Sequence, residues 1–415
     1  MSLSMKKSST LFFGNLFEHY ETALFGFLSP FLAPLIFPQQ DPVSALIYTY
    51  AIIPLGMLSR PLGALFFGYM GDVYGKEWSL SYTLYSMAVV SLCMALIPIQ
   101  GAMGFMAPLL FLLGRALQNF FAAGETMGGA ILLLDSAPKN RSDFFSSLYS
   151  SSAICGHLLA SFGVYVISVW GSIETGWKAL YLLGTITAFF GSAVRGEFKK
   201  QNNTTGEKLV STLISNWKII LKVMFVSGFA TATYSLAFVL MNGLIPLVSS
   251  LTKTDVMKMN TALLLFDACS FPFFGWLASK FSRDKWMLCL TCLAILIGFP
   301  LFISLEGASK VTVLSVRLVL VGLGVAFFAP FHAWAQEVVP QKNRYLVISF
   351  GYALGSQLLG SPAAALSLWM YQQTGLTASL CLYWLLLAIA CSIFIDRGSN
   401  AHQSGPFLNR NRVIV

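Results

Sequence analysis

Charged side chains are scarce in this sequence. Only 10% of its 415 residues are Asp, Glu, Lys or Arg, whereas soluble domains carry about 25%. Such a shortage excludes a soluble enzyme, a nucleic-acid-binding module and a disordered chain. Hydrophobic residues make up 56% of the sequence, and they form runs of about 18 residues or more, the length needed to cross a bilayer. The composition therefore predicts an all-α integral membrane protein.

Other chemical features are missing as well. All seven cysteines lie in apolar runs, where a thiol behaves as a small hydrophobic group, so we expect neither disulfides nor a metal site. No Gly-x-x-x-x-Gly-Lys-Ser/Thr loop occurs, which argues against transport driven by ATP. No constellation of catalytic side chains indicates an enzyme, and no motif calls for a cofactor.

Hydropathy predicts twelve membrane-spanning helices in two groups of six. The predicted spans are 11–37, 44–70, 79–99, 105–134, 144–170, 177–194, 217–249, 260–280, 286–305, 311–336, 345–371 and 376–396. A polar break follows the sixth span. It divides the chain into an N-terminal bundle at 1–195, a cytoplasmic linker at 196–216, a C-terminal bundle at 217–397 and a short tail at 398–415.

The net charge of +9 is concentrated on one side of the predicted topology. With the N-terminus inside, nineteen of the 26 Lys and Arg residues fall in loops on the inner side and four on the outer side. Basic residues accumulate in cytoplasmic loops, so we expect both termini in the cytoplasm and the chain in a cell membrane, the inner membrane if the source is bacterial. This distribution accounts for the positive charge without a nucleic-acid partner.

Two sequence patterns recur about half a chain length apart. The first pair comprises Gly68-x-x-x-Asp72-x-x-Gly75-Lys76 and Gly275-x-x-x-Ser279-x-x-Ser282-Arg283. The second pair comprises Asp135-Ser-Ala-Pro138-Lys-Asn140-Arg141 and Glu337-Val-Val-Pro340-Gln-Lys-Asn343-Arg344. Each copy follows the equivalent span of its half. The repeats therefore predict two bundles of parallel topology with a cavity between them near the middle of the membrane.

The first of these patterns resembles the loop signature of the major facilitator superfamily. Three further motifs resemble its metabolite:proton symporters, which include transporters of proline, glycine betaine, 2-oxoglutarate, citrate and shikimate. They are Gly14-Asn15-Leu-Phe-Glu18-His19-Tyr20-Glu21, Arg60-Pro61-Leu-Gly63 and Arg115-Ala-Leu-Gln118-Asn119-Phe120-x-x-x-Gly124-Glu125. The resemblance implies the major facilitator fold, with twelve helices in two pseudo-symmetric six-helix bundles, and transport by alternating access. His19 stands where the subfamily has an aromatic residue.

Charged residues cluster at the predicted cytoplasmic helix ends, where ion pairs and helix dipoles can hold that side closed. The resemblance implies that this region is a latch that breaks in the inward-open state. The residues predicted to form this cytoplasmic gate are Asp72, Gly75, Lys76, Asp135, Arg141, Glu337 and Arg344. The alternative is that these charges only set the topology of the loops.

Three acidic residues lie within predicted spans of the first half. A charge at a helix centre costs about 2.5–3.5 kcal/mol on insertion scales, so each must be paired or face water. A carboxyl group in a poorly solvated site retains a proton readily, and a second acid strengthens this tendency. Glu18 and Glu21 lie one helical turn apart. We therefore predict Glu18, Glu21 and Glu125 as the proton-coupling residues.

Further polar residues within the spans are predicted to bind the substrate, in part because a guanidinium group matches a carboxylate bidentately. They are Arg60, Arg115, Gln118, Asn119, His157, Asp267 and Arg317. Structural alternatives remain open for them. Arg60 and Arg115 neutralise the acids in one alternative, and Asp267 and Arg317 form a single ion pair in another.

We therefore predict an importer of a small carboxylate-bearing metabolite or a zwitterionic osmolyte, driven by protons. We expect a monomer whose partners are its substrate, protons and membrane lipid. A proton-antiporting exporter on the same fold is one alternative, although 153–169 lacks the proline found in the motif of such exporters. A non-transporting nutrient sensor is another, for which we would expect a long cytoplasmic signalling segment.

Overall fold

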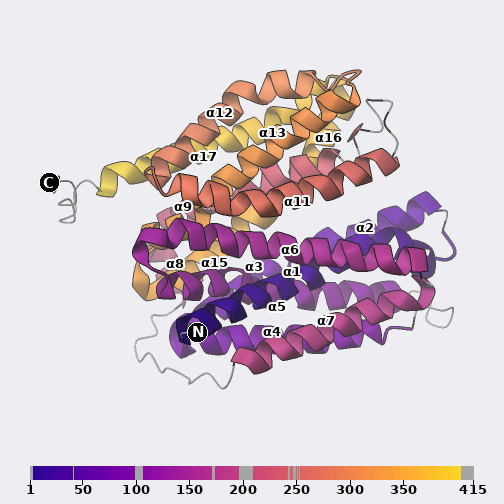
Figure 1. Ribbon diagram of the computed structural model, residues 1–415, viewed down its shortest axis with the longest axis horizontal. Helices are drawn as coiled ribbons and strands as arrows, with labels where there is room; N and C mark the ends of the chain where they lie inside the picture. Colours follow the sequence, from indigo (N-terminus) through magenta and orange to yellow (C-terminus); the bar gives the residue numbers. More distant parts are fainter. Residues whose placement is uncertain are drawn as a thin grey trace.

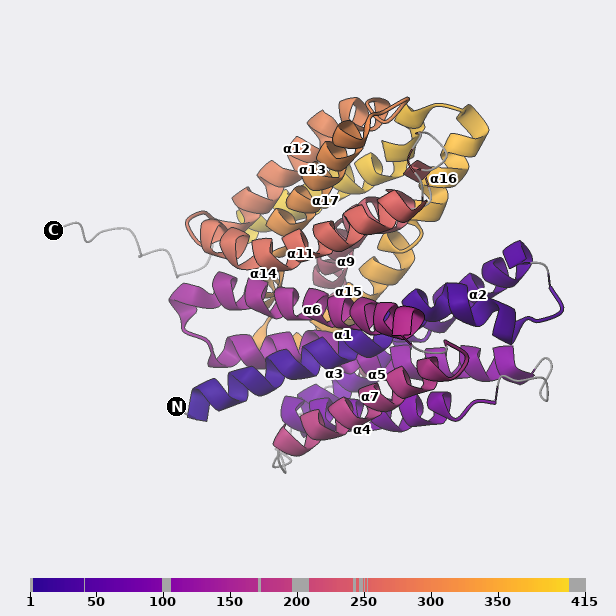
Figure 2. The same cartoon turned by 45° about the vertical axis from the view of Figure 1, so that its right-hand side comes forward.

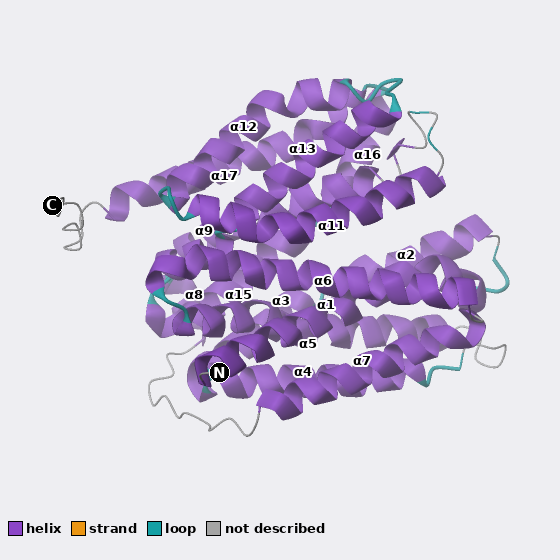
Figure 3. Ribbon diagram, viewed as in Figure 1, coloured by secondary structure: helices purple, strands orange, loops and turns teal. Residues whose placement is uncertain are grey.

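The computed structural model describes residues 3–40, 42–98, 106–170, 173–195, 209–241 and 253–402, together with residues 244, 245, 249 and 251. Throughout this part of the chain every regular element is helical (Figure 3). Eight of the helices described are both long enough and apolar enough to cross a bilayer. The all-helical fold expected from the composition is confirmed.

The first half forms one group of helices, the lower group in Figure 1. Its members are α1 (Leu3–Ile36), α2 (Pro42–Met57), α3 (Arg60–Tyr74), α4 (Lys76–Ala95), α5 (Met106–Ser136), the short η1 (Lys139–Arg141), α6 (Ser142–Trp170) and α7 (Ile173–Arg195). The predicted span 44–70 is thus two helices. The break falls just before Pro61, whose missing N–H is tolerated in a first helical turn.

The second half forms a second group of helices. Its members are α9 (Trp217–Tyr234), η2 (Ser235–Leu240), α11 (Lys253–Ala278), α12 (Arg283–Ile303), α13 (Lys310–Phe328), α14 (Phe331–Val338), η3 (Gln341–Asn343), α15 (Arg344–Leu354), η4 (Gly355–Gly360), α16 (Ala363–Thr374), η5 (Thr377–Cys381) and α17 (Leu382–His402). The elements η2 and η4 are single π-helical turns, which are wider than an α-helix and occur often at functional sites.

Two boundaries of the predicted division differ from the structure. The helix α8 (Leu209–Ser215) lies inside the predicted linker, of which residues 196–208 are outside the described part of the chain. The final helix, α17, continues to His402 and so occupies the start of the predicted tail, whereas residues 403–415 are also outside the described part. The helix α17 ends at the same end of the molecule at which α1 begins (Figure 1).

Two helices of the second group, α11 and α15, make most of the contacts between the groups. The helix α6 packs on α11, and α15 packs on α3 and α5, so that α15 lies beside the first group in both views (Figures 1 and 2). At the opposite end of the molecule α2 and α16 diverge (Figure 2). The halves are therefore held together mainly at the end that holds the α3–α4 and α11–α12 connections.

Small residues bring the helices of the first group into close contact, as is usual in membrane bundles. A Cβ atom on Gly63 of α3 would lie 2.0 Å from the carbonyl oxygen of Phe120 in α5. A Cβ atom on Gly124 of α5 would lie 2.5 Å from a methyl carbon of Thr83 in α4. The packing of α5 against both neighbours therefore requires glycine at these positions.

We expect Gly63→Ala to destabilise the protein, because the added methyl group would meet backbone atoms that cannot rotate away. Overpacking typically costs about 1–3 kcal/mol, whereas the higher helix propensity of alanine returns at most about 1 kcal/mol. The apparent melting temperature of the detergent-solubilised protein should fall. Gly26→Ala is the matched control, since nothing lies within 4 Å of a Cβ atom there. Equal melting temperatures for the two variants would contradict the close contact.

Candidate functional site

A cavity of about 190 Å³ lies between the two groups of helices. Its first-half wall comes from α1, α5 and α6 and includes Asn15, His19, Thr126, Ser150 and His157. Its second-half wall comes from α9, η2, α11, α13, α14 and α15 and includes Tyr234, Phe238, Asp267, Phe271 and Phe328. The cavity is therefore bounded by both predicted bundles.

The charge pattern of this cavity is asymmetric. Three of the four histidines of the chain line it: His19, His157 and His332. Asp267 is the only Asp, Glu, Lys or Arg among the described residues that line it. The ring of His157 lies 5.4 Å from that of His19 and 6.5 Å from that of Tyr234, measured between centroids. Two of these imidazoles, those of His19 and His157, belong to the first half, whereas His332 of α14 and the carboxylate of Asp267 belong to the second.

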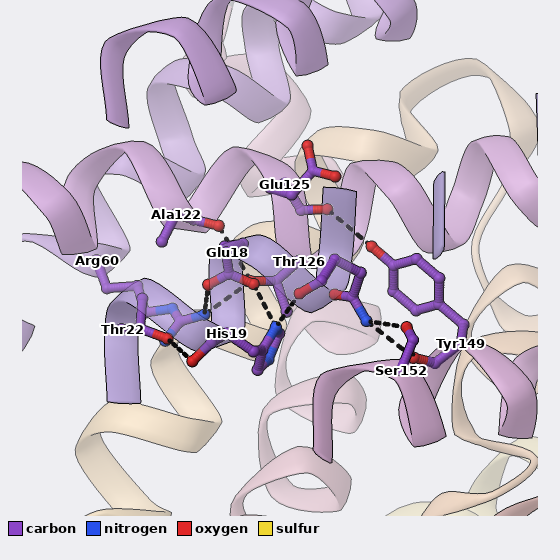
Figure 4. A network of polar contacts seen from close by, with 10 residues as sticks. Glu18, His19, Thr22, Arg60, Ala122, Glu125, Thr126, Tyr149 and Ser152 are labelled. Atoms are coloured by element: carbon purple, nitrogen blue, oxygen red, sulfur yellow. Dashed lines mark hydrogen bonds and ion pairs between the residues drawn. The ribbon is translucent and has the colours of Figure 1, made fainter. Parts of the chain in front are cut away.

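Directly behind His19 lies the buried carboxylate of Glu18 (Figure 4). His19 Nδ1 is 2.6 Å from Glu18 Oε2, and Arg60 Nη2 is 3.6 Å from Glu18 Oε1. The same Arg60 nitrogen donates a hydrogen bond to Thr126 Oγ1 at 2.7 Å. His19 and Thr126 both line the cavity, so each of these side chains separates Glu18 from the cavity by a single residue.

The position of α1 is fixed by Asn15, one turn before Glu18. Its side-chain amide donates to the carbonyl oxygen of Tyr149 at 2.8 Å and lies 2.9 Å from the hydroxyl of Ser152, both on α6. A Cβ atom on Gly156 of α6 would lie 2.2 Å from the carbonyl oxygen of Leu16. This close packing of α1 on α6 places His19 beside His157.

Glu21 belongs to a different polar cluster, inside the first half. It accepts a hydrogen bond from Ser91 of α4, and Gln118 of α5 donates to Ser91 at 3.0 Å. Arg115 donates to Gln118 at 2.9 Å and to the carbonyl oxygen of Thr22 at 2.9 Å. The two carboxylates that share one face of α1 in the sequence therefore contact different partners. Only Glu18 has direct partners that line the cavity.

The remaining residues predicted for coupling and binding lie away from the cavity wall, except His157 and Asp267. Asn119 donates to the carbonyl oxygen of Arg115 in its own helix, at 2.9 Å. The side chain of Glu125 is buried and points away from Glu18 (Figure 4). Arg317 donates to Asn260 of α11 at 2.7 Å, rather than to Asp267. The substrate-binding roles of Arg60, Arg115, Gln118, Asn119 and Arg317 stay predictions.

At one end of the molecule Asp72 joins the two halves. Its carboxylate accepts hydrogen bonds from the backbone N–H groups of Tyr345 and Leu346, at 3.3 and 2.9 Å, in the first turn of α15. A helix N-terminus has unpaired N–H groups and a partial positive charge, which favour a carboxylate. Nearby, Asp135 lies 2.6 Å from Lys76 and 3.4 Å from Arg344.

The side chain of Tyr345 is inserted into the first half at the same place. Its hydroxyl donates to the carbonyl oxygen of Gly124 at 2.5 Å, and the whole residue is buried. Cβ atoms at Gly71 and Gly128 would lie 2.0 and 2.3 Å from atoms of this tyrosine. Tyr345 was not among the residues predicted for the gate. The glycines on the facing helices were the only available signal for it.

A second ion-pair cluster joins α6 to α12. Arg283 contacts Asp143 Oδ1 through Nε at 2.6 Å, Glu337 through Nη1 at 2.5 Å and the hydroxyl of Ser142 through Nη2 at 2.7 Å. Asp143 was not predicted. Arg283 is part of the repeated pattern but was not included in the predicted gate.

The remaining two predicted gate residues have different environments. Gly75 connects α3 to α4 with a φ of 104°, a conformation that favours glycine. Arg141 lies in η1 and its side chain is exposed. We call the contacts of Asp72, Lys76, Asp135, Arg344 and Tyr345, together with the Arg283 cluster, the latch. The functional role of the latch stays a prediction.

Comparisons with known proteins show where this chain is similar to others. The family model "Sugar (and other) transporter" matches residues 8–196. A citrate-proton symporter of Klebsiella pneumoniae is 27% identical over 392 residues, which cover 92% of this chain and 88% of the relative. An alpha-ketoglutarate permease of Escherichia coli K12 is 27% identical over 389 residues, covering 91% and 89%. A shikimate transporter of the same organism is 26% identical over 390 residues, covering 87% and 86%.

Solved structures of low sequence identity share the fold. A proton:xylose symporter bound to 6-bromo-6-deoxy-D-glucose superposes with a TM-score of 0.76 at 13% identity, covering 95% of each chain. A bacterial homologue of the iron transporter ferroportin, in its outward-facing state, gives a TM-score of 0.70 at 15% identity and covers 95% of this chain and 99% of that chain.

We expect Asp72→Asn to loosen the latch. The variant keeps the shape of the side chain but replaces charge-assisted hydrogen bonds, worth about 1.5–3 kcal/mol net, by weaker neutral ones. A loss of about 1.4 kcal/mol shifts an equilibrium tenfold, so a second conformation with the latch open should become populated. Double electron–electron resonance between spin labels at Asn140 and Gln341, one on each half, would measure the separation.

The matched control for this variant is Ser136→Ala. Ser136 lies at the same end of the molecule, is exposed, and bonds only a carbonyl of its own helix. Its distance distribution should equal that of the unmodified protein. An Asp72→Asn variant with an unchanged distribution would show that the carboxylate does not hold the halves together.

Proposed function

Because this chain belongs to the major facilitator superfamily, among its sugar and metabolite transporters, we propose that it imports a small carboxylate-bearing metabolite or zwitterionic osmolyte together with a proton. The observation that carries the proposal is the contact between Glu18, a buried acid, and His19, a residue of the cavity wall. The relatives support the substrate class, since they are named for citrate, alpha-ketoglutarate, shikimate and proline/betaine, all of which carry a carboxylate.

In this proposal the chain forms twelve spans in two six-helix bundles, divided at residues 196–216. The latch end, with both termini, faces the cytoplasm, which agrees with the excess of Lys and Arg in the loops of that end. Alternating access then consists of breaking the latch while the opposite end closes around the cavity. Both walls of the cavity come from one chain, so a monomer is sufficient.

Coupling follows from competition for Arg60. When Glu18 is ionised, its carboxylate compensates the guanidinium at 3.6 Å. When Glu18 takes up a proton through His19, Arg60 loses that counter-charge. The positive charge of Arg60 then acts on the cavity, because its guanidinium is bonded at 2.7 Å to Thr126, a residue of the cavity wall. An anionic substrate group on the cavity side then restores the balance. Proton and substrate therefore stabilise each other on the protein, which is the thermodynamic requirement for symport.

The Glu21 cluster has a supporting role in this scheme. Glu21, Ser91, Gln118 and Arg115 connect α1, α4 and α5 by hydrogen bonds within the first half. A buried charged cluster of this kind fixes the orientation of α1 and with it the position of Glu18. The proton therefore binds at Glu18, whereas Glu21 and Glu125 are the alternative sites that the experiment below must separate from it.

The direction of proton movement distinguishes import by symport from the alternative exporter. In proteoliposomes without an imposed gradient, adding substrate outside should acidify the lumen if proton and substrate move together. An antiporter would make the lumen more alkaline. A non-transporting sensor would leave the lumenal pH unchanged while still binding the substrate. A panel of citrate, 2-oxoglutarate, shikimate, proline and glycine betaine serves as the set of probes.

We expect Glu18→Gln to abolish uptake driven by a pH gradient while exchange of internal for external substrate persists. The amide fixes the neutral form of the side chain, and exchange does not require release of the proton whereas net uptake does. Radiolabelled uptake and counterflow in proteoliposomes measure the two activities separately. Glu306→Gln, which removes an exposed acid from a loop of the second half, is the control and should accumulate substrate normally.

Two other outcomes would assign the proton to a residue other than Glu18. If Glu18→Gln accumulates substrate at the level of the unmodified protein and Glu21→Gln does not, the proton binds in the Glu21 cluster. If both variants accumulate substrate and Glu125→Gln fails, it binds at Glu125. Either result would contradict the coupling scheme built on His19 and Arg60.

A further inference from the structure

Asp267 is a buried carboxylate that the coupling scheme does not use. Only 3% of the residue is exposed, and its Oδ2 atom has no hydrogen-bond partner among the described residues. It is also the only acidic residue among the described residues that line the cavity, and neither Lys nor Arg is among them. An ionised carboxylate in such a place is unfavourable unless a positive charge joins it. Among the residues described, the cavity wall has no Lys or Arg to supply this charge, and its only basic side chains are the imidazoles of His19, His157 and His332.

The second-half wall of the cavity, which holds Asp267, is rich in aromatic residues. Phe271 lies one turn further along α11, and Tyr234 and Phe238 face the same cavity from α9 and η2. The rings of Tyr234 and Phe238 lie 4.7 Å apart between centroids. Aromatic faces attract cations, most strongly where water is excluded, and a carboxylate among aromatic rings is the usual recognition site for ammonium groups.

The opposite wall has complementary chemistry. His19 and His157 face the cavity there, together with the hydroxyls of Thr126 and Ser150. Imidazole N–H groups can donate hydrogen bonds to an anion without a fixed positive charge on the wall. The two hydroxyls donate to the carbonyl oxygens of Ala122 and Ser146 in the structure, and can donate to an anion after rotating away from them. A molecule with a cationic nitrogen at one end and a carboxylate at the other therefore matches the cavity, with its nitrogen towards the second half.

We propose that the substrate is a zwitterion whose cationic nitrogen is held by Asp267 among Tyr234, Phe238 and Phe271. This inference rests on the proposed function and narrows it, because it selects zwitterions and excludes dicarboxylates and tricarboxylates as the preferred substrates. A second carboxylate on the substrate would meet Asp267 at close range and be repelled. Asp267 is thus the specificity-determining residue of the second half.

Carbon isosteres test the role of the nitrogen with the unmodified protein. Glycine betaine and 3,3-dimethylbutyrate have the same shape and the same carboxylate, and differ only in the quaternary nitrogen. Proline and cyclopentanecarboxylate form a second pair. The stabilisation of the full-length protein in lipid nanodiscs, followed by its melting temperature over a range of concentrations, gives the affinity for each probe. We expect at least one zwitterion to bind ten-fold or more tightly than its isostere.

A substitution then connects this preference to the carboxylate. In Asp267→Asn the zwitterion should lose its ten-fold advantage and bind like its isostere, whereas Asp267→Glu should retain a preference. Glu306→Gln removes an exposed acid from the same half and should leave the preference unchanged. If Asp267→Asn does not fold, the isostere pairs with the unmodified protein and Asp267→Glu still decide the question.

The possible results separate this inference from the proposed function. Equal binding of zwitterions and isosteres, a preference that survives in Asp267→Asn, or binding of citrate or 2-oxoglutarate alone would overturn the role of Asp267. The last result, accompanied by lumenal acidification, would leave proton-coupled import intact. Zwitterion binding that depends on Asp267 but moves no protons would support this inference and overturn the proposed function instead.

Discussion

The contact between Asp72 and the first turn of α15 determines how the two halves lie. A carboxylate in one half accepts two backbone N–H groups of the other, and the adjacent Tyr345 is inserted between α3 and α5. Backbone donors cannot move independently of their helix, so this interaction fixes the whole of α15. Since α15 packs on α3 and α5, and α11 packs on α6, the two halves lie side by side and the cavity is bounded by both.

Membrane burial explains why the polar residues of the first half occur as connected clusters. With no water in the hydrocarbon region, each polar group must find a partner within the protein. Arg115 and Glu21 meet this requirement through Gln118 and Ser91, and Arg60 meets it through Thr126 and Glu18. The second half has fewer such groups. Asp267 is the exception, because its partner on the cavity side is not supplied by the residues described.

Much of the architecture could be predicted from the sequence, but the partners of individual side chains could not. The helical fold follows from long apolar runs, and the positions of the helices follow from the polar breaks between them. Glu18 and Glu21 were assigned to one face of α1 because helical periodicity reports only the face. It does not report that neighbouring helices approach that face from different directions. Tyr345 lacks any charge or motif, so only the facing glycines Gly71 and Gly128 indicated that it is inserted there.

The π-helical turn at η2 is a place beside the cavity where the chain can lose one residue without disturbing the helix around it. Such a turn holds one residue more than the α-helix on either side of it, and each residue of an α-helix advances the side chains by about 100°. Deleting one residue within Ser235–Leu240 would therefore restore a regular α-helix and leave both flanking segments in phase. The same deletion within α9 would rotate Tyr234 out of the cavity wall. Homologous chains that are one residue shorter here should consequently be aligned with their gap inside η2, because a gap placed earlier, within α9, would align Tyr234 with a residue on a different face of the helix.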